Sequence, residues 1–192
     1  MRLERELKEA GDAALAELGL TPSTAVRGLW EQAARRGKGI ESIAPLLLGE
    51  VVCLRLLVCT DVWVALLDKR PRPEAQGLLR SAQAAKAELL YPATALKDVF
   101  VALGGTEGKK GAWRAVDRMR DLGTAVGMDE ADLTAACRYR MLSGSLDENM
   151  ALAAAERAQA DYLVTFSEAL LQRSTVAALS PKDMCAVLEA RA

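Results

Sequence analysis

Apolar and polar residues in the first part of the chain repeat with the period of a helix. Residues 3–18 place leucine and alanine on one stripe and charged side chains opposite, and Gly19 suits the end of that helix. Thr21-Pro22-Ser23 then begins a second helix, with proline at its first position behind a threonine cap. The pattern predicts a small helical segment over residues 1–44, followed by a linker over residues 45–51.

The pattern changes near residue 51, where nine residues are apolar except for Arg55. Such a run suits a strand buried on both faces, as in a parallel sheet. Residues 88–91 and 162–165 are two more short strand candidates. The helical patterns between and after them cover residues 61–67, 73–87, 94–103, 110–122, 129–141 and 146–159, and Ser180-Pro181 caps a last helix. Glycines at 104–105, 123, 127 and 144 are expected to separate the last four of these patterns. Strands alternating with helices predict an α/β domain over residues 52–192, with a parallel sheet flanked by helices.

Composition excludes several kinds of chemistry. The 192 residues carry a net charge of −1, so a nucleic-acid partner would need a local basic patch. The sequence has no histidine, which excludes Ser-His and Cys-His catalysis and histidine-ligated zinc. Its four cysteines form no CxxC pair, and no apolar run is long enough to span a bilayer. We therefore expect a cytoplasmic protein with reduced thiols and no membrane partner.

Three stretches of the second part resemble, in order, the PIN family, which includes the VapC toxins. Residues 56–68, around Cys59-Thr60-Asp61, resemble the opening strand and turn, and residues 91–100 resemble the helix that carries the second acid. Residues 154–165 resemble the helix and late strand that follow the third acid. The resemblance covers residues 52–192 and implies the PIN fold. It also implies a ribonuclease in which clustered carboxylates hold Mg²⁺ or Mn²⁺, hard cations that prefer oxygen ligands.

The implied site is incomplete at its first positions. Cys59 stands where the family has its leading aspartate, and a thiol is a poor ligand for Mg²⁺. Asp61 lies two residues further and points to the same side, so we expect it to substitute in part. Asp98 matches the second acid. The alternative roles are a helix N-cap for Asp61 and a solvated helix position for Asp98.

The later positions are also altered. Ser145 stands at one acidic position and Glu148 at the next, with Asp147 between them, so either acid is a candidate ligand. Their alternative role is that of first-turn acids on a helix. Thr165 and Ser167 match the hydroxyl positions after the late strand, whereas the following acid has become Leu170. The expected catalytic set is Asp61, Asp98 and Glu148, with Asp147 as a further metal ligand.

Basic residues gather in two places. Lys109, Lys110, Arg114 and Arg118 lie on one predicted helix beside Trp113, which suggests a surface for phosphates. The alternative is a solvated helix face with Trp113 in the core. The second cluster is the run Lys69-Arg70-Pro71-Arg72, which the resemblance places at the border of the active-site groove.

The first part of the chain resembles RelB/DinJ-type ribbon-helix-helix antitoxins, through Glu6-Leu7-Lys8-Glu9-Ala10 and residues 18–27. Such proteins read DNA with a strand ahead of the helix, which here is squeezed into Met1-Arg2-Leu3-Glu4. A strand this short pairs weakly, so DNA binding by this segment is not the expected role. Both resemblances imply self-association or a toxin–antitoxin partner.

Three functions follow from these observations. The altered acids favour a non-catalytic module that binds RNA, DNA or a protein partner in a toxin–antitoxin system, with weak or no nuclease activity. The retained Asp98 supports the alternative of an active Mg- or Mn-dependent VapC-like ribonuclease. A third possibility is a fusion in which the N-terminal helices block the groove of the PIN-like domain.

Overall fold

The structure of this chain is a computed structural model that describes Thr21 and residues 53–190. The helical segment predicted over residues 1–44, its short strand and the linker at residues 45–51 lie outside the described residues, apart from Thr21. The description below concerns residues 53–190 alone.

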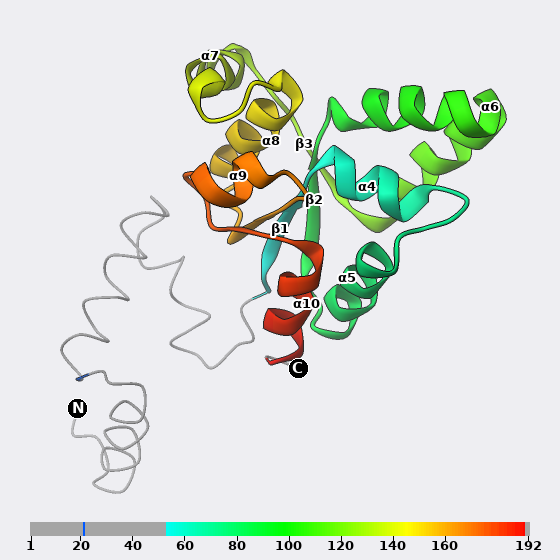
Figure 1. Cartoon of the computed structure of the whole chain (residues 1–192), viewed down its shortest axis with the longest axis horizontal. Helices are drawn as coiled ribbons and strands as arrows, with labels where there is room; N and C mark the ends of the chain where they lie inside the picture. Colours follow the sequence, from blue (N-terminus) through cyan, green and yellow to red (C-terminus); the bar gives the residue numbers. More distant parts are fainter. Residues whose placement is uncertain (1–20, 22–52, 191–192) are drawn as a thin grey trace, which may run out of the picture. The chain divides into compact units, whose positions relative to one another are not determined.

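The centre of this part is a five-stranded sheet in which every pair of neighbouring strands is parallel (Figure 1). The strand order is β3-β2-β1-β4-β5. The strands are β1 (Arg55–Val58), β2 (Glu88–Pro92), β3 (Thr124–Val126), β4 (Tyr162–Val164) and β5 (Ala178–Leu179). The predicted fold class, an α/β domain with a parallel sheet flanked by helices, is confirmed.

The central strand β1 has the two buried faces that its apolar run predicts. Leu56 packs into one hydrophobic core and Leu57 into the other, and both side chains are fully buried. Burial of a leucine contributes about 2 kcal/mol, so β1 stabilises both layers of the domain. Leu57 pairs with Leu90 of β2 on one side and with Leu163 of β4 on the other.

Helices cover both faces of the sheet, which Figure 1 shows nearly edge-on. One face packs against α4 (Thr60–Leu67), α5 (Pro73–Ala84), α6 (Ala95–Leu122) and α10 (Pro181–Glu189). The other face packs against α8 (Leu146–Arg157) and α9 (Glu168–Arg173). Outside α8 lie α7 (Glu130–Arg138) and the short 3₁₀ helix η2 (Tyr139–Met141).

The long helix α6 turns back on itself at one residue. Gly108 has φ +70° and ψ 169°, a conformation that side-chain-bearing residues rarely adopt. The rings of Phe100 and Trp113, thirteen residues apart, are 5.0 Å apart between centroids. In a straight helix thirteen residues span about 20 Å, so the two arms of α6 form an antiparallel hairpin. The sequence predicted two helices here, but the break expected at Gly104 and Gly105 is wrong, because Gly108 makes the turn.

Three short elements were not predicted. β3 has three residues that are mostly exposed at the edge of the sheet, and β5 has two. Neither gives an apolar run or a regular alternation in the sequence. The six-residue α9 is also shorter than the windows in which helical periodicity can be recognised. Within the residues described, no helix has the length and apolar character needed to cross a membrane.

Strand order fixes where a site can form. The chain leaves β1 toward β2 on one side of the sheet, whereas β4 joins β1 on the other side. In open parallel sheets the connections after two such strands diverge, leaving a crevice beyond their carboxyl ends. In this chain that crevice lies beyond Val58 and Val164.

Candidate functional site

A small hollow lies beyond the carboxyl end of β1, with a volume of about 190 Å³. Two segments line it, the start of α4 and the start of α8. The lining residues are Cys59, Thr60, Asp61, Ser145, Asp147, Glu148 and Ala151. Five of them, namely Cys59, Asp61, Ser145, Asp147 and Glu148, were singled out from the sequence, and the structure brings them together.

Cys59 forms the wall of this acidic hollow nearest to the sheet. It is the N-cap residue of α4, its backbone N–H donates to the Val164 carbonyl (2.9 Å), and only 4% of its surface is exposed. Burial raises the pKa of the Cys59 thiol well above its usual range, and the charges of Asp61 and Glu148 raise it further. The hydroxyl of Thr165 lowers the pKa but does not offset these effects. A neutral thiol therefore occupies the position at which the PIN resemblance expects a carboxylate.

Asp61 connects α4 to the loop after β4. Its Oδ2 accepts hydrogen bonds from Thr165 Oγ1 (3.0 Å) and from the Phe166 backbone N–H (2.7 Å). Its Oδ1 accepts from the Val62 N–H (2.7 Å). The alternative N-cap role for Asp61 is wrong, since Cys59 holds that position and Asp61 is the second residue of α4. Asp61 instead joins the first turn of α4 to the loop after β4 at the crevice.

The pKa of Asp61 reflects a crowded acidic site. Partial burial of the carboxylate raises the pKa above 3.8, and the nearby charge of Glu148 adds to the increase. The three hydrogen bonds at Asp61 lower the pKa, because they favour the ionised form, but the net shift is upward. The negative charge of Glu148 is thus close enough to Asp61 to disfavour the ionised form of the Asp61 carboxyl.

The start of α8 supplies the other acids. Ser145 is the N-cap of α8 and its Oγ accepts from the Glu148 N–H (3.4 Å). The Glu148 carboxylate accepts a hydrogen bond from the hydroxyl of Ser143, a buried residue. Asp147 is exposed at the rim of the hollow. Both acids lie in the first turn of α8, so their helix-terminal role and their place in the hollow coexist.

Asp98 lies on the first turn of α6 and is not among the residues that line the hollow. Its Oδ1 pairs with Lys97 Nζ at 2.9 Å, and 19% of its side chain is exposed. This pairing raises the pKa of the Lys97 ammonium, to which the more distant charge of Asp147 also contributes. Lys97, which sequence reasoning missed, therefore pairs with the second acid and also interacts electrostatically with Asp147 of the hollow.

The residues after β4 support the hollow without lining it. Thr165 is fully buried and accepts a hydrogen bond from the Ser167 N–H (3.0 Å). Ser167 is the N-cap of α9, where its Oγ accepts from the Leu170 N–H (3.5 Å). Leu170 is fully buried in the core against α8. The position at which the resemblance places a late acid is thus a core position in this chain.

The side chains expected to bind Mg²⁺ or Mn²⁺ are not arranged to hold a divalent ion in this structure. Throughout the described part of the chain, no three cysteine, aspartate or glutamate side chains are grouped to hold a metal ion. The carboxylate oxygens of Asp61 accept hydrogen bonds from three protein donors. Asp98 is paired with Lys97, and Cys59 is a neutral thiol. Mg²⁺ requires near-octahedral oxygen ligands, which this set does not supply.

Basic residues adjoin the acidic hollow on the α4 side. A second hollow, of about 320 Å³, contains Asp61 in its lining together with Arg70, Arg72 and Phe166. The Arg72 guanidinium lies over the Phe166 ring, 5.1 Å from its centroid. Arg70 and Arg72 of the basic run therefore lie beside Asp61, where the PIN resemblance implied that this run borders the groove. Phe166 was missed, because an isolated aromatic after a strand carries no sequence signal.

The basic cluster on α6 divides between two surfaces. Lys109, Lys110 and Arg114 are exposed on the second arm of the hairpin, whereas Arg118 lines a third hollow described below. Trp113 is 59% exposed and packs edge-on against Phe100. The alternative that placed Trp113 in the core is wrong.

The sheet order, the helical layers and the acid-lined crevice together define the PIN-like class of α/β folds. Three solved structures have this fold over nearly their whole length. VapBC2 of Rickettsia felis bound to a promoter DNA fragment is 12% identical and matches 66% of this chain and 98% of its own, with a TM-score of 0.54. VapC20 of Mycobacterium tuberculosis, a Sarcin-Ricin loop cleaving toxin, is 14% identical and matches 62% of this chain and 96% of its own, with a TM-score of 0.51. PAE2754 of Pyrobaculum aerophilum is 15% identical and matches 72% of this chain and 99% of its own, with a TM-score of 0.53.

The described part of the chain therefore has the PIN-like fold found in VapC proteins, and the recognition from the sequence is confirmed at the level of the fold. No family model and no curated protein matches the sequence.

Proposed function

We propose that this chain is a PIN-fold protein of the toxin–antitoxin type that binds RNA at the crevice beyond β1 and β4 and cleaves it weakly or not at all. Residues 52–192 form the RNA-binding domain in this proposal, and residues 1–44 an antitoxin-like segment. The similar structures include a toxin–antitoxin complex and a toxin that cleaves the Sarcin-Ricin loop, which support this choice of system and ligand.

The observation that carries the proposal is the neutral, buried thiol of Cys59 at the end of β1. A metal-dependent nuclease needs converging carboxylates to hold a cation that activates water and neutralises phosphate charge. With a thiol at this position and the Asp61 oxygens already hydrogen-bonded, a Mg²⁺ or Mn²⁺ ion has few free ligands. Binding is favoured by the arginines beside the crevice, which attract a phosphate backbone.

The alternative is an active Mg- or Mn-dependent ribonuclease. One observation favours it: Asp61, Asp147 and Glu148 line the same hollow, at the place where a parallel sheet of this order forms its ligand site. A modest movement of the Asp61 side chain away from Thr165 would free an oxygen for a metal ion.

Mn²⁺ titration calorimetry and an RNA cleavage assay distinguish the two functions. The proteins are the wild type, Glu148→Gln in the hollow and Glu74→Gln on the exposed first turn of α5 as the matched control. We expect all three to bind a structured RNA with similar affinity, and none to cleave it with Mn²⁺. Mn²⁺-dependent cleavage by the wild type and the control that falls at least tenfold in Glu148→Gln would establish the ribonuclease instead.

A further inference from the structure

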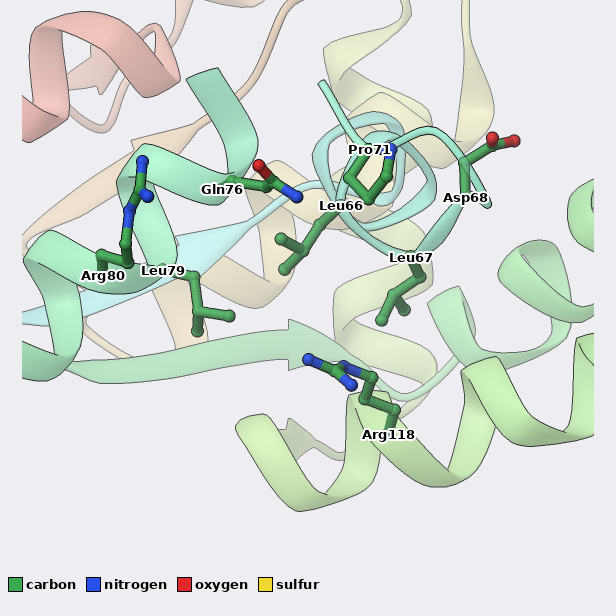
Figure 2. Close-up of a pocket in the computed structure, with 8 residues that line it drawn as sticks. All are labelled: Leu66, Leu67, Asp68, Pro71, Gln76, Leu79, Arg80 and Arg118. Atoms are coloured by element: carbon green, nitrogen blue, oxygen red, sulfur yellow. The ribbon is translucent and has the colours of Figure 1, made fainter. Parts of the chain in front are cut away.

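A third hollow lies between α4, α5 and the second arm of α6, with a volume of about 430 Å³. Its apolar part is formed by Leu66, Leu67 and Leu79. Figure 2 shows Arg80 on α5 and Arg118 on α6 at two sides of this leucine surface, with the Arg118 side chain toward the leucines and the Arg80 guanidinium turned away from Leu79. An arginine at each side of an apolar surface suits a strand that carries several anionic groups and flat or apolar parts between them.

Both arginines are available for a ligand. Arg80 and Arg118 are exposed, and among the described residues the ion pairs of basic side chains involve Arg55, Lys97 and Arg157 instead. Asp68 also lines the hollow, but its Oδ1 accepts a hydrogen bond from the Arg70 backbone N–H (2.9 Å) within its own loop. The positive charge of the hollow is therefore only partly compensated by protein groups.

Three hollows lie one after another along α4, and the hollow with Arg80 and Arg118 is at one end of this series. Asp68 lines both the Arg80/Arg118 hollow and the Arg70/Arg72 hollow, and Asp61 lines both the latter and the acidic hollow. The seven-residue separation along α4 corresponds to about 10 Å. A nucleic-acid strand advances about 3.4 Å per stacked nucleotide, so this distance corresponds to roughly three nucleotides.

We propose that Arg80 and Arg118 bind backbone phosphates of the same RNA strand that enters the acidic hollow, at least about three nucleotides away from it. This inference rests on the proposed RNA-binding function. Arg70 and Arg72 hold the intervening phosphates, and the leucine surface between α4 and α5 contacts the face of a base. Single strands are bound in this way by basic grooves that also offer apolar surface for bases.

The test measures fluorescence anisotropy of labelled single-stranded RNA, with a dinucleotide and a twelve-nucleotide strand. The variant Arg80→Gln/Arg118→Gln is compared with the wild type and with Arg138→Gln/Arg140→Gln, which removes two exposed positive charges near η2. We expect the first variant to bind the long strand on the order of tenfold more weakly at low salt, and to reduce the slope of log affinity against log salt by about 1.4. Its affinity for the dinucleotide, and all affinities of the control, should match the wild type.

The outcomes separate this inference from the function on which it rests. If the wild type binds neither RNA, the proposed function fails. If it binds the long strand and the Arg80/Arg118 variant binds equally well, only the present inference is overturned. An equal loss for dinucleotide and long strand would also overturn it, because the hollow would then act as an isolated anion site. A poly-glutamate peptide whose binding depends on the two arginines, with RNA binding unchanged, would assign the hollow to an acidic protein partner.

Discussion

Replacing Cys59 by aspartate tests whether the acidic hollow is one residue short of a metal site. Cys59 is 4% exposed, and its thiol lies near the negative charges of Asp61 and Glu148. A carboxylate at the same place adds a fourth acid to a small hollow in which the pKa of Asp61 is already raised. We therefore expect Cys59→Asp to be less stable than the wild type without metal and to be stabilised specifically by Mn²⁺.

The magnitude follows from two opposing effects. An uncompensated buried charge costs about 3 kcal/mol. Cys59 is also the N-cap of α4 and makes no side-chain capping bond, so an aspartate gains about 1 kcal/mol by accepting from the first-turn N–H groups. The net loss in the free energy of unfolding is about 2 kcal/mol, which lowers the urea midpoint by about 1 M for an m-value near 2 kcal/mol/M. Mn²⁺ at a hundred times its dissociation constant then restores about 2.7 kcal/mol.

The assay is urea unfolding followed by circular dichroism, in EDTA and at increasing Mn²⁺. Cys59→Asn is the matched control, because it offers the same capping oxygen without the charge. Metal-dependent stabilisation should occur in Cys59→Asp and be small in the wild type and in Cys59→Asn. Equal stabilisation of the wild type would refute the reasoning, since the thiol would then be no obstacle to a metal. A folded Cys59→Asp that gains nothing from Mn²⁺ would refute the view that the acids converge.

Three further predictions concern the fold around the site. Gly108→Ala should lower the free energy of unfolding by about 1 kcal/mol, because alanine is strained at φ +70°. Gly105→Ala in the helical arm should leave that free energy unchanged or raise it, because an added Cβ meets nothing within 4 Å there. Chemical denaturation measures both variants. The folded state holds the Asp61 proton more tightly than the unfolded chain does, so the stability of the wild type relative to Asp61→Asn should be greatest below about pH 3.8 and fall as the pH rises through the raised pKa. Urea titrations from pH 3 to 7 check this, and a relative stability that grows with pH would contradict it. Leu152→Ala, in the core against the sheet, should cost about 2–5 kcal/mol in the same unfolding assay, while Leu146→Ala, 57% exposed on the same helix, should cost less than about 0.5 kcal/mol.

The elements that the sequence predicted well are those whose burial imposes a pattern. The run over residues 51–59 is apolar because β1 has two buried faces, and Ser180-Pro181 marks the start of α10 because Ser180 Oγ accepts from the Asp183 N–H (3.2 Å). β3 escaped prediction because an exposed three-residue edge strand needs no apolar pattern. The break in α6 was assigned to the wrong glycine, since sequence does not reveal which of several glycines adopts a positive φ.

Some residues of the candidate site could also be predicted from the sequence, whereas the contacts that hold them could not. The resemblance selected Cys59, Asp61 and Glu148, which line one hollow, because side-chain identity at fixed offsets from a strand is visible in a sequence. The Phe166 backbone N–H that holds Asp61 was not predictable, because every residue but proline carries that group. The engagement of Asp98 by its neighbour Lys97 depends on side-chain rotamers, which a sequence does not specify.

The purely parallel sheet has a consequence for how the chain folds during synthesis. Leu57 of β1 pairs with Leu90, 33 residues later, and with Leu163, 106 residues later. A ribosome adds roughly 5–20 residues per second, so the apolar central strand waits at least about five seconds for its last neighbour. High contact order also slows folding after release. The strongly apolar β1 is therefore exposed to aggregation during translation, and a chaperone or an early partner that covers it would protect the chain in that interval.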